Sequence, residues 1–230
     1  MRIYNEFGVR PTTNHKAAGY DFYIPNIVKP VEKCDVIFEA FSKSYKMSVQ
    51  DLHDLQNNLL NYAQEIWGDK VKGNEMNILF LYLFTDAPFK LDDDPITYFV
   101  EEYLIFDDNN TPGICPEPLD QVFINSGIHV ALNPHTVGIF FNKSGKGTKG
   151  WDVRAQVIDE DYTGFVHLSL AYTKDNEEDG IIYVGDKITQ MIIWNIEGDN
   201  VEELDKETYY NIMAGSQRGA SAFGSSDEKH

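Results

Sequence analysis

The sequence has few cysteines and no long apolar run. Its two cysteines, Cys34 and Cys115, are too few for a disulfide scaffold and favour free thiols in a reducing compartment. The longest apolar run, from Ile78 to Phe84, has seven residues and is too short to span a bilayer. No basic segment followed by an apolar one opens the chain, so we expect a cytoplasmic protein without a secretory leader.

Positive charge is also scarce. The 230 residues include 19 Lys and Arg against 37 Asp and Glu, which gives a formal net charge of −18. Because an acidic surface repels phosphates, we expect no nucleic-acid binding, and any phosphate site must be a local basic pocket. The 42% hydrophobic and 13% aromatic content is typical of a globular protein rather than a disordered chain.

Short strand-like runs separated by turn residues fill residues 1–34 and 121–215. Many short strands at this spacing predict a β-barrel or sandwich. The end of the chain, from Gly215, is rich in small residues and is expected to be mobile.

The segment 35–120 has a helical pattern instead. Ser48 begins a capping-box-like sequence, and apolar residues at helical spacing follow it as far as Gly68. Asp94 and the following proline predict a second helix start. Periodicity leaves open whether the apolar run 76–84 is a buried strand or a helix. With 17 acidic and 5 basic residues, this segment carries most of the net negative charge.

The stretch Gly145-Lys-Gly-Thr148 resembles the end of a P-loop, but a P-loop needs a glycine where this chain has Phe140. Two interpretations remain. The stretch is either a charged hairpin turn or a phosphate-binding turn in which Ser144 donates its hydroxyl and Lys143 supplies charge.

Three consecutive acids, Asp159 to Asp161, precede Tyr162 and Gly164 between two strand-like runs. The simpler interpretation is a solvated hairpin turn. The functional one is a carboxylate that orients and deprotonates a water molecule.

Five stretches of the chain, taken in order, resemble the five motifs of the trimeric dUTPase family. They are AAGYDFY (17–23), NKSG (142–145), VIDEDYTG (157–164), GDKITQ (185–190) and RGASAFGSS (218–226). The resemblance implies a mainly β fold, a dUTPase-like β-clip or jelly-roll barrel that forms a homotrimer with active sites at subunit interfaces. Residues 1–34 plus 121–215 would form this barrel, 35–120 a mainly α-helical insertion, and 216–230 a flexible arm that closes the active site.

The resemblance also implies a reaction, in which dUTP is hydrolysed to dUMP and pyrophosphate. This reaction limits uracil in DNA and supplies dUMP for dTTP synthesis. Asp159 would activate the attacking water, and Tyr162 would pack beneath the deoxyribose. Asp21 would contact Mg²⁺ through its water shell. The other implied substrate-binding residues are Lys143, Ser144, Gly145, Gln156, Val157, Lys187, Gln190, Arg218, Phe223, Gly224 and Ser225, with backbone groups near Gln156 and Val157 pairing with the uracil edge and Arg218 binding the γ-phosphate.

The chain departs from the family pattern at four positions. Lys143 and Lys187 stand where the motifs usually have arginine, which keeps the charge but loses bidentate geometry. Thr163 stands where arginine is common, and Gln156 where glycine is common. None of these changes removes a catalytic group.

Two alternatives to a simple dUTPase stay open. A dCTP deaminase of the same fold would need a glutamate where this chain has His167, and would lack the Phe-Gly-Ser tail. The insertion could instead make the protein a nucleotide-gated regulatory binder of another protein, as insertions do in some phage dUTPases. Otherwise residues 35–120 would stabilise the trimer or pack on the barrel.

Overall fold

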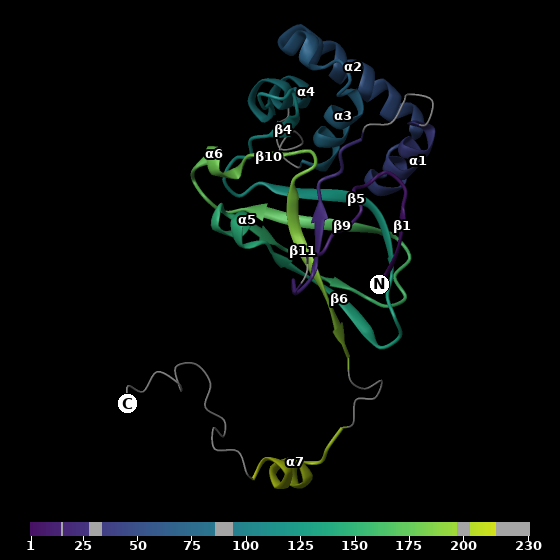
Figure 1. The fold of residues 1–230 in the computed structure, drawn as a ribbon, viewed down its shortest axis with the longest axis vertical. Helices are drawn as coiled ribbons and strands as arrows, with labels where there is room; N and C mark the ends of the chain where they lie inside the picture. Colours follow the sequence, from purple (N-terminus) through teal and green to yellow (C-terminus); the bar gives the residue numbers. More distant parts are fainter. Residues whose placement is uncertain (15, 28–33, 86–93, 197–202, 215–230) are drawn as a thin grey trace. The chain divides into compact units, whose positions relative to one another are not determined.

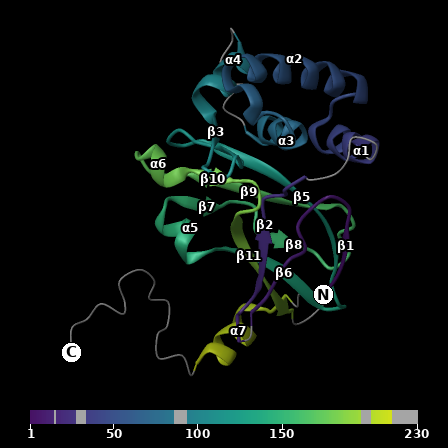
Figure 2. The same ribbon diagram turned by 45° about the horizontal axis from the view of Figure 1, so that its top comes forward.

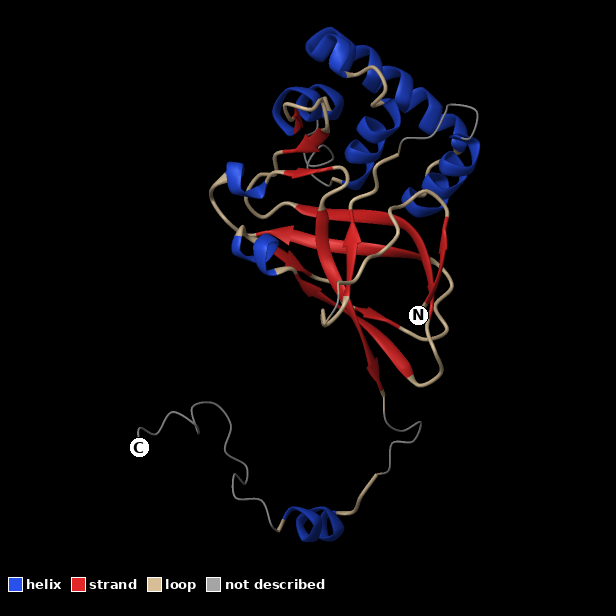
Figure 3. Cartoon of the chain, in the orientation of Figure 1, coloured by secondary structure: helices blue, strands red, loops and turns tan. Residues whose placement is uncertain are grey.

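The computed structural model describes residues 1–14, 16–27, 34–85, 94–196 and 203–214 (Figure 1). They belong to two units, Met1–Ile196 and Glu197–His230. In the described part of the chain, the first unit combines three β-sheets with a group of helices (Figure 3). The second contains α7 (Lys206–Met213), and the carboxylate of Asp205 caps its N-terminus. None of the helices in the described residues has the length and apolar character needed to cross a bilayer.

All neighbouring strands in the three sheets are antiparallel. The first sheet has the order β1 (Arg2–Asn5), β5 (Gln121–Ala131), β9 (Phe165–Tyr172), β7 (Trp151–Val153). The second has the order β2 (Tyr20–Tyr23), β11 (Lys187–Asn195), β6 (Thr136–Asn142), β8 (Val157–Ile158). The third has the order β10 (Ile182–Tyr183), β4 (Pro112–Ile114), β3 (Leu104–Phe106).

In the first unit, the described residues form six α-helices. They are α1 (Cys34–Tyr45), α2 (Val49–Trp67) with the 3₁₀ turn Gly68–Lys70, α3 (Glu75–Phe84), α4 (Pro95–Tyr98) with the π-helical turn Phe99–Tyr103, α5 (Ser144–Thr148) and α6 (Glu177–Gly180). Ser48 and Asp51 form the capping box that starts α2. Asp94 caps α4, and Pro95 occupies its first position.

The apolar run 76–84 lies in α3 and not in a strand. Every residue from Met76 to Phe84 is buried, so the helix is apolar on all sides and its sequence has no amphipathic period. The buried side chain of Asn77 accepts a hydrogen bond from the Ile27 amide at 2.7 Å and donates one to Asn26. This buried amide ties α3 to the segment that follows β2.

The helical segment and the barrel strands share one hydrophobic core. Phe41 of α1 stacks on Phe80 of α3, and both contact Phe7, which follows β1. Phe7 in turn contacts Phe165 of β9. Figure 2 shows α1, α2 and α3 grouped on one side of the sheets. The helices are therefore packed on the first sheet and belong to the same unit.

The strand boundaries differ from the expected domain limits at two places. The segment 35–120 also contains the strands β3 and β4, which pair with each other. Strand β4 also pairs with β10 from the second half of the chain. The barrel strands end earlier than 215, since β11 ends at Asn195 and the first unit ends at Ile196. Residues 206–213 form α7 in the second unit.

Candidate active site

Four of the five motif stretches lie in one sheet. In the order β2-β11-β6-β8, β2 holds Asp21, β11 holds Lys187 and Gln190, and β6 leads into Lys143. Strand β8 contains Val157 and Ile158, the first two residues of the motif VIDEDYTG. Residues more than a hundred positions apart become neighbours because Gln190 lies opposite both Asp21 and Phe141 in the strand register.

We call Asp21, Lys143 and Lys187 the phosphate-side cluster. The Asp21 carboxylate lies 2.5 Å from the Lys143 Nζ and 3.1 Å from the Lys187 Nζ. Burial opposes its ionisation, but the hydrogen bonds and charges of the two lysines outweigh burial and hold the pKa of Asp21 below its ordinary value. The hydrogen bond to Asp21 raises the pKa of Lys187. The ammonium groups of Lys143 and Lys187 therefore lie close together around the Asp21 carboxylate.

Ser144 and Gly145 lie beside this cluster, at the start of the short helix α5, and both are exposed. A Cβ added at Gly145 would meet nothing within 4 Å, so packing does not explain this glycine. Gln190 donates from its side-chain amide to the Asn142 carbonyl at 3.2 Å. The predicted phosphate-binding residues of the second and fourth motifs are thus close together.

Lys146, in the same short helix, forms an ion pair. Its Nζ lies 2.7 Å from the Asp186 carboxylate, and its side chain is only 17% exposed. The same Asp186 oxygen accepts the Tyr183 amide, which closes the turn before β11. The pattern Gly-Lys-Gly-Thr gave no sign of this partner, because it lies 40 residues away. Lys149, by contrast, is exposed.

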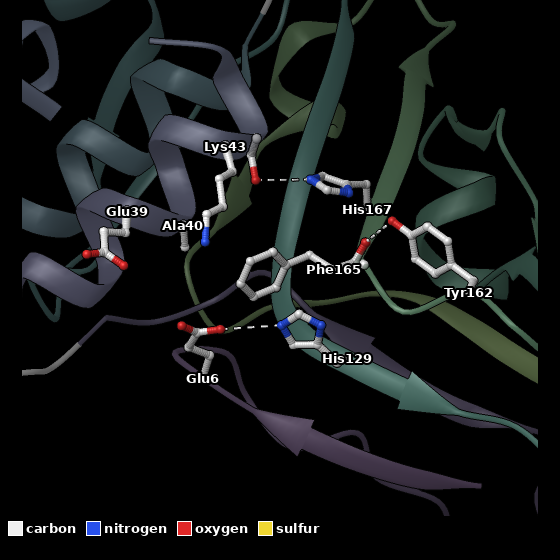
Figure 4. A pocket seen from close by; sticks show the side chains of 10 residues that line it. Glu6, Glu39, Ala40, Lys43, His129, Tyr162, Phe165 and His167 are labelled. Carbon is white, nitrogen blue, oxygen red and sulfur yellow. Dashed lines mark hydrogen bonds and ion pairs between the residues drawn. The ribbon is translucent and has the colours of Figure 1, made fainter. Parts of the chain in front are cut away.

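We call residues 159–164, between β8 and β9, the motif-3 turn. Asp159 is exposed, and its carbonyl accepts the Tyr162 amide at 3.2 Å. The Tyr162 hydroxyl donates to the Phe165 carbonyl at 2.7 Å (Figure 4). A Cβ on Gly164 would lie 2.4 Å from the Tyr162 hydroxyl oxygen, so only glycine lets the ring fold back there. Partial burial raises the pKa of Tyr162.

The strands on either side of this turn separate before they reach it. The Arg154 amide bonds the Ser169 carbonyl at 2.8 Å, but β8 then pairs with β6 and not with β9. Because the Phe140 amide bonds the Gln156 carbonyl, the next pair, Ile139 and Val157, is of the non-hydrogen-bonded kind. The backbone N–H and C=O of Val157 therefore point away from β6. Among the described residues, β8 is the edge strand of its sheet, so these groups could read the edge of a planar base.

Backbone recognition of this kind leaves no side-chain signal in a sequence. Gln156, which we expected to pair with uracil, has its carbonyl engaged by Phe140 and its side-chain amide bonded to the Val153 carbonyl at 3.1 Å. Of the two backbone groups of Gln156, the N–H is therefore the one left for a base.

The phosphate-side cluster and the motif-3 turn do not converge within one chain. Lys143 follows one end of β6, whereas Asp159 follows Ile158, which pairs with Gly138 near the other end. Five residue steps of extended strand correspond to roughly 17 Å. Arg218, Phe223, Gly224 and Ser225 lie outside the described residues.

Asp21 is the carboxylate that the motif resemblance predicts to contact Mg²⁺ through water. Among the described residues, no three His, Cys, Asp or Glu side chains are placed to hold a metal. Both Asp21 oxygens face lysine ammonium groups. A lone carboxylate of this kind can contact Mg²⁺ through a water shell, which suits an ion that dehydrates reluctantly.

A pocket of about 330 Å³ lies between α1 and the motif-3 turn (Figure 4). Sequence reasoning did not single it out. It is lined by Glu6, Glu39, Ala40, Lys43, Ser44, His129, Tyr162, Gly164, Phe165 and His167. Burial lowers the pKa of His167, with a backbone hydrogen bond near Phe165 opposing it, and the ring stacks on Phe123 at 4.6 Å. The helical segment therefore reaches the candidate active site.

Comparisons with known proteins agree with this geometry. No curated protein matches the chain. A variant of the dUTPase of Staphylococcus phage 80alpha is 13% identical, with 98% of this chain and 97% of that chain covered at a TM-score of 0.51, and so has the same fold. Another variant of the phage 80alpha dUTPase, with bound dUpNHpp, is 18% identical over 50% of this chain and 85% of that one, at a TM-score of 0.41.

The dUTPase of phage phi11 of S. aureus, described with a structural Mg(II) ion, is 16% identical over 41% of this chain and 83% of that one, at a TM-score of 0.35. The decisive match is to a family model. Residues 113–227, half of the chain, match the model of the dUTPase family. The chain belongs to the dUTPase family.

Proposed function

We propose that this dUTPase hydrolyses dUTP by attack of an Asp159-activated water on the α-phosphate. The water oxygen forms the new bond to the α-phosphorus, and Asp159 accepts the proton. The bond between the α-phosphorus and the oxygen bridging to the β-phosphate breaks, and pyrophosphate leaves with its electron pair. The products are dUMP and pyrophosphate, and we place the reaction in the cytoplasm.

One observation carries this proposal. The sheet β2-β11-β6-β8 gathers four motif stretches that are dispersed over residues 17–190. Phosphoryl transfer needs charge neutralisation and a positioned nucleophile more than covalent chemistry by the protein. Lys143 and Lys187 would supply the first need, and the motif-3 turn the second.

The two lysines face Asp21 here, so substrate binding requires an exchange of partners. Phosphate oxygens would take over Lys143 and Lys187, and Asp21 would turn to the water shell of Mg²⁺. The ion supplies further neutralisation of the phosphate charge. Ser144, Gly145 and Gln190 would donate to the remaining phosphate oxygens.

The base would lie beside the edge strand β8. The outward-facing backbone of Val157 offers one donor and one acceptor, which complement the uracil edge and mismatch cytosine. Tyr162 would cover the sugar where a 2′-hydroxyl has no room. Phe223, Gly224 and Ser225 would close over the bound nucleotide, and Arg218 would hold the γ-phosphate.

We further propose that the active unit is a homotrimer. The separation of roughly 17 Å along β6 leaves each half of the site incomplete within one chain. A second copy that brings its motif-3 turn to the phosphate-side cluster of the first would complete it.

Release of pyrophosphate from dUTP, dCTP, dTTP and UTP tests the proposal, with Asp159→Asn as the matched variant. We expect turnover of dUTP alone. Equal turnover of UTP would contradict the role of Tyr162, and turnover of dCTP would contradict base reading by Val157. The deaminase alternative predicts ammonia release from dCTP, but the β9 sequence FVHLSLAY contains no acid, and its His167 ring is stacked on Phe123.

A second candidate function is a nucleotide-gated binder of another protein. The observation that favours it is that α1 of the helical segment and Tyr162 line the same pocket. The phage 80alpha relative is described as having a SaPI-inducing capacity linked to its enzymatic activity. Capture of a partner by the full chain, with and without a non-hydrolysable dUTP analogue, would test it; capture that ignores the analogue would reject gating.

A further inference from the structure

His129 is directed at the motif-3 turn by an irregularity in β5. The register between β5 and β9 shifts between Asn125 and His129. Gly127 lies inside this shift with φ 69°, and a Cβ there would come within 2.4 Å of the Gly8 amide nitrogen. Such a bulge re-aims the side chains that follow it. Here the His129 ring faces the carbonyl of Thr163, the residue between Tyr162 and Gly164.

The contacts of His129 settle one of its protons. The Nδ1 atom lies 3.0 Å from the Thr163 carbonyl oxygen, and a carbonyl can only accept, so Nδ1 carries hydrogen. The Nε2 atom lies 3.3 Å from a Glu6 carboxylate oxygen (Figure 4). The ring also packs on Phe165 with 4.1 Å between centroids. The imidazole is therefore a link between the end of β1, strand β9 and the motif-3 turn.

We propose that His129 is a positioning residue for the dUTPase reaction, and this inference rests on the proposed function. Its Nδ1–H holds the Thr163 carbonyl, and so fixes the last part of the turn that presents Asp159 and Tyr162. The Tyr162 hydroxyl itself donates to the Phe165 carbonyl, so two separate hydrogen bonds hold this part of the turn. In this role His129 acts through the turn and not on the reacting atoms.

The bulge that aims His129 is anchored from the helical segment. Asn125 accepts the Gly127 amide at 2.9 Å and donates to the Ser44 hydroxyl of α1 at 2.7 Å. Asn125 is fully buried, so both bonds lie out of water. These hydrogen bonds and the backbone from Gly127 to His129 thus connect α1 with the turn.

Three substitutions separate the two ring nitrogens. In His129→Asn the amide nitrogen occupies the place of Nδ1 and can still donate to Thr163. In His129→Gln the amide reaches the place of Nε2 and faces Glu6 instead, and His129→Ala removes both. We expect kcat/KM for dUTP to fall about tenfold in the Gln and Ala variants, the effect of one lost hydrogen bond, and to be largely restored in the Asn variant.

Amide hydrogen exchange over residues 159–165 in the free protein gives a second readout that needs no activity. We expect faster exchange in His129→Gln than in His129→Asn at similar melting temperature. His53→Gln in α2 is the control for loss of a histidine elsewhere and should leave this segment unchanged. If Asn and Gln behave alike in both assays, the positioning role is wrong.

Failure of the proposed function has a different result. A wild-type chain that releases no pyrophosphate from dUTP would reject that function, and the exchange difference would still decide the role of His129. If Ala does not fold, the Asn and Gln pair gives the answer alone.

Discussion

The two halves of the active site are held by different kinds of contact. In the phosphate-side cluster, charged side chains from β2, β6 and β11 hold one another through ion pairs. In the motif-3 turn, the side chain of Asp159 is exposed, and backbone carbonyls accept the bonds that shape the turn. The first half has its charges in place before substrate arrives, and the second has its geometry in place.

This difference teaches how each half should respond to substitution. A side chain in the cluster is replaceable in part, because a neighbouring lysine can supply charge to the same phosphate. The turn has no second carboxylate held in the same position as Asp159. Loss of function should therefore be graded in the cluster and abrupt in the turn.

The largest effect is expected for Asp159→Asn. The amide cannot accept the proton of the attacking water, so kcat should fall about 10³-fold while an unhydrolysed dUTP analogue still binds. Steady-state release of pyrophosphate and calorimetric binding measure the two quantities. Asp161→Asn, on the same exposed turn, is the matched control and should remain near wild type. Equal losses in both variants would contradict a unique role for Asp159.

Lys143→Ala should have the next largest effect. Loss of one charge-assisted bond to phosphate should raise KM for dUTP about 10- to 100-fold, with a smaller change in kcat. Lys143→Arg should keep or improve binding, because a guanidinium can bind two phosphate oxygens at once. Lys149→Ala, an exposed lysine of the same loop, is the control. If Lys149→Ala weakens binding as much as Lys143→Ala does, the cluster is not the phosphate site.

Ser144→Ala and Lys146→Ala should separate activity from stability. The serine makes no contact that packing needs, so its loss should lower activity and leave melting unchanged. The partly buried Lys146–Asp186 pair should contribute about 1 kcal/mol to the free energy of unfolding, and its loss should act mainly there. Urea unfolding and dUTP turnover of both variants test this. A larger activity loss in Lys146→Ala would mean that the turn before β11 matters more than the serine hydroxyl.

Local patterns predicted much of this fold, and long-range partners account for what they missed. The capping residues Ser48 and Asp94 mark the starts of their helices because caps act within one turn of chain. Helix α3 could not be told from a strand, since burial on all sides removes the period that distinguishes them. The partner of Lys146 depends on a sheet register that no local pattern records.

The site shows the same division. The roles of Asp21, Lys143 and Asp159 stay predictions from the motifs, and the sheet brings Asp21 and Lys143 into contact. His129 was not predicted, because a lone histidine in a strand signals nothing until the bulge at Gly127 aims it at Thr163. The edge of β8 at Val157 presents backbone groups, which any residue has.

The smallest expected effect concerns pH and the turn side of the site. Burial between Phe123 and the Ser44 hydroxyl lowers the pKa of His167, so the folded protein binds this proton less readily than the unfolded chain. The stability from His167 is thus complete above its unfolded pKa, near 6.5, and is lost as the pH falls through the lowered folded value. The melting temperature should decline between about pH 7 and about pH 5, and less so in His167→Gln. His135→Asn, at an exposed position with φ 57° that asparagine tolerates, should leave the decline unchanged. If the melting temperature declines equally with pH in wild type and His167→Gln, His167 is not the titrating group, and burial does not lower its pKa as inferred.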